Sequence, residues 1–99
     1  MRVLVFSRAR RDIAAAVTWW RANRPSAPGL LEAELGAELN QLESQPFSAP
    51  RARDAGLRHY HRWPLVNTRY HLYYRVNEAK QQLEILRLWH MSRRRPKVL

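Results

Sequence analysis

The segment Thr68–Val76, with the sequence TRYHLYYRV, most constrains how this chain can fold. In an extended strand its side chains alternate, and one side carries Tyr70, Leu72, Tyr74 and Val76. The opposite side carries Arg69, His71, Tyr73 and Arg75. The segment contains no Gly or Pro and is rich in Tyr, which favours a strand. We therefore predict a strand with one buried apolar side and one exposed side that is available for function.

Two helices are predicted before this strand. A short strand at Arg2–Phe6 leads into a segment with the spacing of one apolar helix face, formed by Ile13, Ala16, Val17 and Trp20. Pro25 ends this helix. The second helix has a leucine stripe at Leu31, Leu35, Leu39 and Leu42, with Glu32, Glu34, Glu38 and Glu43 mostly outside it. Because few residues join the two helices, they should form an antiparallel hairpin.

The second half of the chain is predicted to complete a sheet. Residues 44–54 contain two prolines and are expected to form an extended linker. A strand is predicted at Leu57–Arg62, and Pro64 should interrupt it before Thr68–Val76 begins. The last strand is predicted at Leu83–Trp89. It is apolar enough to be central in the sheet, and Trp89 is expected to close the core.

The predicted fold is α+β, in the order βααβββ. It is a small, mainly antiparallel sheet with the helical hairpin packed on one face. Residues 1–99 should form a single domain, with 91–99 as a basic C-terminal tail. The absence of Cys excludes disulfides, thiolate zinc sites and a cysteine nucleophile. The apolar run Val3–Phe6 is too short for a signal peptide or a membrane span, so we expect a soluble, cytoplasmic protein.

The charge of the chain is its strongest compositional feature. Eighteen basic residues against eight acidic ones give a net charge of +10 at pH 7. Residues 1–28 carry six Arg and one Asp, residues 29–45 carry four Glu and no basic residue, and the remainder is strongly basic. Sixteen of the basic residues are Arg, which is suited to bidentate contact with phosphate or carboxylate. A basic body with one acidic helix indicates an anionic partner, or an acidic protein inhibitor on the basic side.

The chain resembles a known family in several motifs. They are Gly56-Leu57-Arg58 at the start of a predicted strand, the segment Arg69–Val76, and the end of the last strand, Leu86-Arg87-Leu88-Trp89-His90, with arginines after it. Together with the order of elements, these motifs resemble the ParE/RelE superfamily of bacterial type II toxin–antitoxin toxins, often called plasmid stabilisation proteins. The resemblance covers essentially the whole chain. It implies a cognate antitoxin that wraps the basic surface and neutralises the toxin.

The resemblance leaves two targets open. RelE-like members cut messenger RNA in the ribosomal A site, whereas ParE-like members are not nucleases and poison DNA gyrase. In a RelE-like enzyme the catalytic residues would be His71, His90 and Arg93. However, His71 stands where such nucleases place an arginine, and no residue matches their catalytic carboxylate or terminal tyrosine. We therefore favour a ParE-like toxin that inhibits gyrase and replication.

Each candidate residue also has a structural interpretation. His71 would be a half-exposed strand histidine beside Tyr73, and His90 a strand-end histidine that is hydrogen-bonded to the backbone. His59 and His61 would project from one side of a strand, but no third ligand is forced nearby, so no metal or other cofactor is predicted.

The residues expected to bind an antitoxin or target form an exposed basic group. They are Arg69, Tyr73 and Arg75 on the strand, Arg87 on its neighbour, and Arg93, Arg94 and Arg95 in the tail. A third hypothesis, outside the toxin class, is a basic protein that binds nucleic acid without catalysis. It rests only on the net charge and the interleaved Arg and Tyr.

Overall fold

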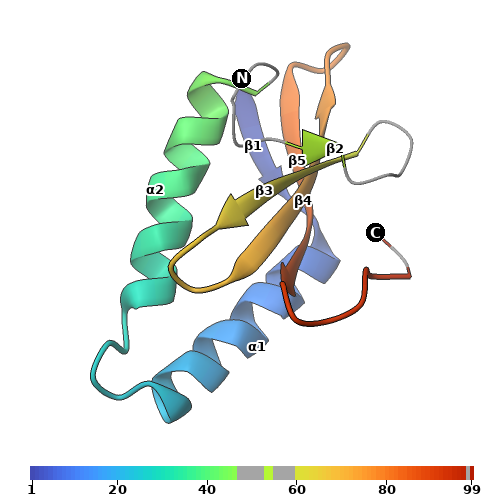
Figure 1. Ribbon diagram of the computed structural model, residues 1–99. Coiled ribbons are helices and arrows are strands. Elements are labelled where there is room, and N and C mark those ends of the chain that lie inside the picture. Colours follow the sequence, from blue (N-terminus) through green and yellow to red (C-terminus); the bar gives the residue numbers. More distant parts are fainter. Residues whose placement is uncertain (47–52, 55–59, 98) are drawn as a thin grey trace.

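The computed structural model describes residues 1–46, 53–54, 60–97 and 99. The described residues form two helices and a five-stranded sheet, whose arrangement can be followed in Figure 1. In chain order the elements are β1 (Arg2–Val5), α1 (Ser7–Asn23), α2 (Leu30–Ser44), β2 (Arg53–Asp54), β3 (His61–Leu65), β4 (Tyr70–Asn77) and β5 (Gln82–His90). The predicted order βααβββ is confirmed, with the two-residue strand β2 added inside the predicted linker.

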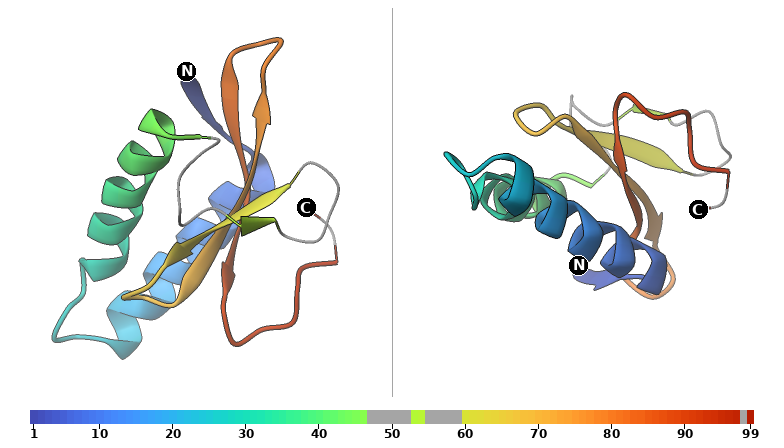
Figure 2. Two further views of the ribbon diagram at one scale, coloured as in Figure 1. Left: turned by 45° about the horizontal axis from the view of Figure 1, so that its top comes forward. Right: turned by 90° about the horizontal axis from the view of Figure 1, so that it is seen from below.

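The sheet has the strand order β1-β5-β4-β3-β2. Strand β1 is parallel to β5, and every other pair is antiparallel, so the predicted mainly antiparallel sheet is confirmed. Both helices lie against one face of this sheet (Figure 2). Neither helix is long and apolar enough to cross a membrane, within the part of the chain that the structure describes.

The core lies between the helices and this face of the sheet. The predicted apolar side of β4 is buried at Tyr70, Leu72 and Tyr74, and half-buried at Val76. The sheet adds Trp63, Leu65, Leu83, Ile85 and Leu88, and the helices add Ala9, Ala16, Trp20, Leu31, Leu35 and Leu42. The predicted helix faces are therefore confirmed, and Trp19 lies at their edge with 47% of its surface exposed.

Two of the α2 glutamates are not outside the leucine stripe as expected. Glu34 and Glu38 are both buried, each with 7% of its surface exposed. Glu34 accepts hydrogen bonds from the backbone N–H groups of Asn67 and Thr68 and from the Thr68 hydroxyl, at 2.8, 2.9 and 2.6 Å. Glu38 accepts a hydrogen bond from the indole Nε1 of Trp63 at 3.1 Å. These contacts compensate for burying the carboxylates and hold α2 against β3 and the turn that follows it.

The predicted bounds of β3 are wrong in the described residues. The strand spans His61–Leu65 and contains Pro64, whereas a strand at Leu57–Arg62 ending before Pro64 was predicted; residues 57–59 lie outside the described residues. Within the described residues, strand β2 pairs with positions 61 and 62 alone, and no described strand covers β3 at position 64. An edge strand tolerates proline because no neighbouring strand needs the missing N–H.

A β-bulge in β5 changes which of its residues face the core. Tyr73 pairs with Arg87 while Tyr74 pairs with Ile85, so Leu86 is an extra residue in β5. The alternation therefore shifts by one residue, and Leu88 rather than Arg87 continues the buried side. Trp89 lies on the opposite face, half-buried. The prediction that it closes the core is wrong for this reason.

The predicted exposed side of the Thr68–Val76 segment is also wrong in part. Arg69 is not in the strand: it belongs to the preceding turn, with a positive φ of 67°. Tyr73 has only 2% of its surface exposed, and its cross-strand partners are Arg62 and Arg87. His71 and Arg75 are half-buried. This side of β4 is not a continuous solvent-exposed surface.

Candidate functional site

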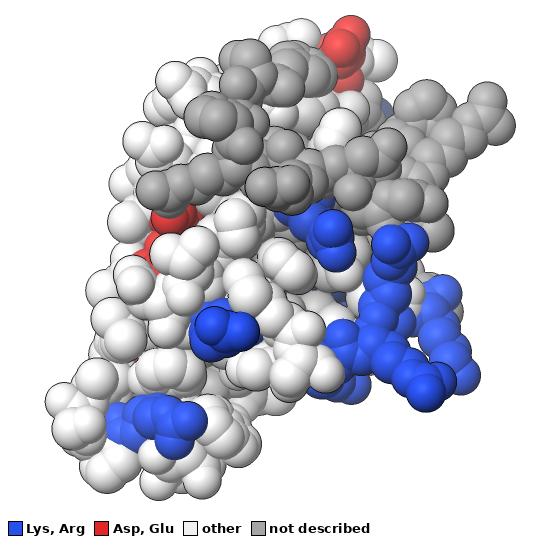
Figure 3. Space-filling model, in the orientation of Figure 1, with Lys and Arg blue, Asp and Glu red and all other residues white. Residues whose placement is uncertain are grey.

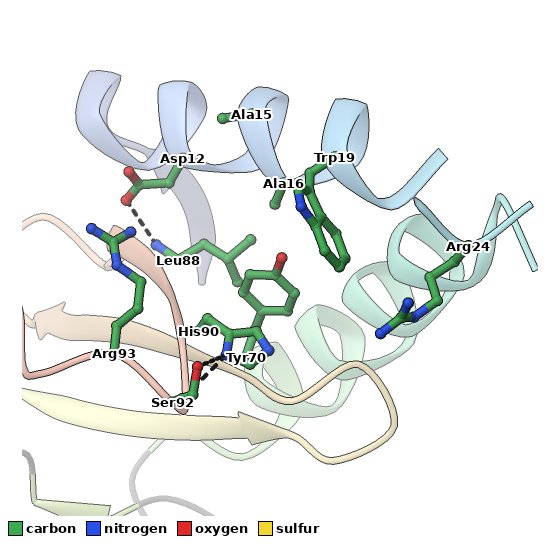
Figure 4. Close-up of a pocket in the computed structure, with 10 residues that line it drawn as sticks. All are labelled: Asp12, Ala15, Ala16, Trp19, Arg24, Tyr70, Leu88, His90, Ser92 and Arg93. Carbon is green, nitrogen blue, oxygen red and sulfur yellow. Dashed lines mark hydrogen bonds between the residues drawn. The ribbon is translucent and has the colours of Figure 1, made fainter. Parts of the chain in front are cut away.

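Two grooves meet where β5 ends and the C-terminal segment begins. The first, here called the helix-side groove, has a volume of about 560 Å³ and lies between α1 and the ends of β4 and β5 (Figure 4). The second, here called the arginine groove, has a volume of about 430 Å³ and lies on the other face of the sheet. It is lined by Arg87, Trp89, Arg93, Arg94, Arg95 and Lys97. Arg93 lines both grooves.

The helix-side groove is open because α1 presents small residues above it. Its lining residues are Asp12, Ala15, Ala16, Trp19, Arg24, Tyr70, Leu88, His90, Ser92 and Arg93. In Figure 4 the Tyr70 hydroxyl points towards α1, beside the indole of Trp19. Burial raises the pKa of the Tyr70 phenol above its ordinary value, so this hydroxyl is neutral at physiological pH. The guanidinium of Arg24 lies 5.3 Å from the ring centroid of Trp19.

His90 lines the helix-side groove and also closes the turn after β5. It pairs across the sheet with Tyr70, and the two rings meet edge to face with centroids 5.0 Å apart. Its Nδ1 accepts a hydrogen bond from the backbone N–H of Ser92 at 3.1 Å and lies 2.7 Å from the Ser92 hydroxyl. With Nδ1 as an acceptor, the proton of the neutral ring is on Nε2. The expected hydrogen bond between this strand-end histidine and the backbone is therefore present.

Asp12 is a site residue that the sequence did not single out. Strand β1 covers β5 only as far as Ile85, which leaves the edge of β5 open beyond that point. Asp12 closes it: its carboxylate accepts a hydrogen bond from the backbone N–H of Leu88 at 3.1 Å. It also accepts two from Arg87, from Nε at 2.6 Å and from Nη2 at 3.0 Å. The available signal was that Asp12 is the one acidic residue among residues 1–28.

The arginine groove is built around Trp89. The guanidinium carbons of Arg93 and Arg87 lie 3.6 and 4.7 Å from its ring centroid, in the geometry of cation–π contacts. The indole Nε1 donates a hydrogen bond to the carbonyl oxygen of Arg94 at 2.6 Å. No local pattern predicts this role for Trp89, because only the bulge in β5 turns its ring away from the core.

The C-terminal segment, Met91–Lys97, is folded against the sheet. The backbone N–H of Met91 donates to the carbonyl oxygen of Arg69 at 2.8 Å. The backbone N–H of Arg93 donates to the carbonyl oxygen of His90 at 3.1 Å. Pro96 is buried, whereas the side chains of Arg94, Arg95 and Lys97 are exposed. Within the described part of the chain, none of these three side chains forms an ion pair.

His71 lies apart from His90. Its partner in β5 is Trp89, whereas His90 pairs with Tyr70; adjacent strand residues face opposite sides of a sheet. Burial, and secondly the charge of Arg62, lower the pKa of His71 below its ordinary value, so its ring is neutral at pH 7. The structure therefore places Arg93 beside His90 in the helix-side groove but does not bring His71 to that site.

The remaining predicted binding residues do not form one patch. Arg75 is paired with Glu84 at 2.5 Å, and this hydrogen bond raises the pKa of its guanidinium further. Arg87 is held by Asp12, and Tyr73 is buried. Arg69 is exposed in the turn before β4. The structure gathers only Arg87, Arg93, Arg94 and Arg95 around one groove, and their binding role stays a prediction.

No group of three or more potential metal ligands occurs among the described residues. His61, one of the two histidines considered for such a site, packs against Tyr74, with ring centroids 5.4 Å apart. The other, His59, lies outside the described residues.

Comparisons with known proteins identify the family. The model of the ParE toxin of the type II toxin–antitoxin system parDE matches residues 3–95. The chain is similar to the structure of the chromosomal ParDE toxin–antitoxin system from P. aeruginosa, with a TM-score of 0.77 at 15% identity, covering 93% of this chain and 97% of that one. A YoeB/ParE toxin from Agrobacterium tumefaciens gives a TM-score of 0.64 at 13% identity, covering 91% and 98%.

A third similar structure is the intact E. coli RelBE toxin–antitoxin complex, with a TM-score of 0.62 at 16% identity, covering 93% of this chain and 98% of that one. No curated protein matches the sequence. At these identities the three structures establish the shared fold, while the family assignment rests on the match over residues 3–95. The resemblance found in the sequence motifs is confirmed: this chain belongs to the ParE toxin family of type II toxin–antitoxin systems.

Proposed function

We propose that this ParE family member arrests growth by inhibiting DNA gyrase in the cytoplasm, and that a cognate antitoxin neutralises it. The observation that carries the choice of target is the separation of His71 from His90. A ribosome-dependent nuclease needs a base for the 2′-hydroxyl, an acid for the leaving oxygen and a cation for the phosphorane, all within reach of one phosphate. Here the two imidazoles face opposite sides of the sheet.

The electrostatics of His71 support the same choice. In the position where RelE-like nucleases have an arginine, a ring that is neutral at pH 7 supplies no positive charge. Arg93 and His90 share the helix-side groove, but within the described residues the carboxylate there, Asp12, is already occupied by Arg87 and the backbone of Leu88. Binding rather than catalysis is the function that fits these residues.

The antitoxin is supported by the family and by the charge. The P. aeruginosa neighbour is described as a ParDE system and the E. coli neighbour as an intact RelBE complex. A net charge of +10 carries self-repulsion that an acidic partner segment would relieve, and among the described residues the exposed Arg94 and Arg95 form no ion pair. Co-expression with the neighbouring reading frame tests this: a cognate antitoxin should restore growth and co-purify with the toxin.

The target is tested with purified toxin and gyrase. We expect inhibition of supercoiling and accumulation of cleaved DNA, and equal potency from a His90→Ala variant. No effect on gyrase at micromolar toxin would contradict the proposal. Primer extension on translated messages is the complementary assay: codon-positioned cuts that disappear in His90→Ala would establish the nuclease instead.

A further inference from the structure

We propose that the arginine groove binds the phosphate backbone of double-stranded nucleic acid. The groove consists of Arg87, Trp89, Arg93, Arg94, Arg95 and Lys97. In Figure 3, Lys and Arg side chains gather on the part of the surface where Figure 1 places the C-terminal segment. The inference concerns the toxin alone and holds whichever enzyme it inhibits.

The first argument is the uncompensated charge of the groove. Five of its six lining residues are cations. Asp12 neutralises Arg87, but among the described residues no carboxylate pairs with Arg94, Arg95 or Lys97. A groove with one sign of charge concentrates oppositely charged ligands, and Arg binds phosphate oxygens in a bidentate manner. The ligand is therefore an anion with several charges.

The second argument is that the groove is held in position before any ligand arrives. The Trp89 ring packs against the guanidinium groups of Arg93 and Arg87, and its Nε1 fixes the carbonyl oxygen of Arg94. Asp12 fixes Arg87 from the far side with two hydrogen bonds. Long arginine side chains ordinarily lose rotamer freedom on binding, so this packing reduces the entropy lost when a ligand binds.

The third argument concerns the kind of anion. Arg and Lys side chains are donors only, and among the described residues Arg94, Arg95 and Lys97 have no carboxylate acceptor, so a ligand that supplies acceptors fits them. A phosphodiester backbone offers acceptors only, whereas an acidic peptide also brings one backbone donor per residue that these side chains cannot satisfy. Double-stranded nucleic acid carries about one charge per 1.7 Å of helix axis, whereas an extended acidic peptide carries at most about one per 3.3 Å.

The packing of Trp89 favours double-stranded over single-stranded nucleic acid as the ligand. Single-strand binding gains about 1–3 kcal/mol for each base that stacks on an aromatic ring. Here Arg93 already lies 3.6 Å from the ring centroid, so a base would have to displace it. The contacts offered are to phosphates alone, which favours the backbone of a duplex and predicts binding that does not depend on base sequence.

The test measures fluorescence anisotropy of a short labelled DNA duplex with purified toxin, at several salt concentrations. The variant is Arg94→Glu/Lys97→Glu, and the matched control is Arg10→Glu/Lys80→Glu; all four side chains are exposed, and both variants change the net charge equally. Loss of two phosphate contacts should make the negative slope of log K against log salt less steep, by about 1.8. The groove variant should bind at least about 10-fold more weakly than the control.

Equal loss of affinity in the two variants would overturn the proposal, because it would assign binding to net charge alone. Equal affinity of wild-type toxin for polyglutamate of matched charge would overturn it in favour of an acidic peptide. Tighter binding of a single strand than of the duplex would overturn the choice of ligand. Thermal melting of every variant, followed by circular dichroism, verifies that each is folded.

A second pair of variants tests the positioning role of Trp89 without changing any charge. Trp89→Leu should weaken duplex binding, and Trp89→Phe, which retains a ring beneath the guanidinium groups, should recover most of it. Equal binding by the leucine and phenylalanine variants would contradict the positioning role. If the leucine variant fails to fold, the Arg94/Lys97 comparison still decides the main proposal, because those side chains are exposed.

Discussion

The charged side chains are buried at the α2–sheet interface, whereas most of those in the arginine groove are exposed. At the interface, Glu34 and Glu38 are buried, and each carboxylate accepts hydrogen bonds from the sheet or its turn. In the groove, Arg94, Arg95 and Lys97 are exposed, without ion pairs in the described part of the chain. The buried carboxylates hold the fold together, whereas the exposed cations are available to a partner.

This difference has a physical basis that mutation can probe. Removing a buried acceptor leaves its donors without partners, at about 1–3 kcal/mol for each group. Removing an exposed cation affects little beyond long-range repulsion, which salt screens. Substitutions at the interface should therefore affect stability, and substitutions in the groove should affect binding.

The largest effect is expected for Glu34→Ala. The change removes the acceptor for the backbone N–H groups of Asn67 and Thr68 and for the Thr68 hydroxyl. We expect the free energy of unfolding, measured by urea denaturation, to fall by about 3 kcal/mol or more. Glu43→Ala, an exposed glutamate on the same helix, is the control and should change it by less than about 0.5 kcal/mol. Similar losses in the two variants would contradict a specific role for Glu34.

The next largest effect is expected for Asp12→Ala. It leaves the backbone N–H of Leu88 and the guanidinium of Arg87 without their shared acceptor, at a site where both side chains are mostly buried. We expect a loss of about 2 kcal/mol in the free energy of unfolding. Asp12→Asn keeps an oxygen for Leu88 and should lose less. If both variants were equally unstable, the charge rather than the hydrogen bond to β5 would be the stabilising feature.

Much of the fold could be predicted because its signals are local. The alternation of Tyr70, Leu72 and Tyr74 and the leucine stripe of α2 each follow from one period of the backbone. The bulge in β5 was not predicted, although adjacent apolar residues at Ile85 and Leu86 break the alternation and indicate such a feature. Without the bulge, Trp89 is assigned to the wrong face.

The site was harder to predict because its contacts join distant parts of the chain. Asp12 and Arg87 are 75 residues apart, and no local pattern pairs them. The same holds for the hydrogen bond from Trp89 to the carbonyl of Arg94, which depends on how the C-terminal segment folds back. The sequence shows that arginines are abundant and clustered in the C-terminal segment. It does not show which of them are neutralised by an acidic partner.

His71 provides a pH-dependent test of the face opposite the helices. Burial and the charge of Arg62 lower its pKa in the folded protein, so the unfolded chain binds the proton first as pH falls. Stability should therefore be fully present above the unfolded pKa of about 6.5 and should decrease below it. His71→Gln should remove this contribution, so its melting temperature should fall less than that of wild type between about pH 7.5 and 5.5. If the melting temperatures of wild type and His71→Gln changed in parallel with pH, His71 would not be the group responsible.

The smallest effect on stability is expected for Arg94→Ala/Lys97→Ala. Both side chains are exposed, and neither forms an ion pair within the described residues, so the free energy of unfolding should change by less than about 0.5 kcal/mol. Any change should be a gain, because removing two cations from a protein of charge +10 reduces self-repulsion. Added salt should therefore raise the melting temperature of wild type more than that of the variant. A clear loss of stability would show that these cations support the fold, and the contrast between the groove and the α2–sheet interface would then fail.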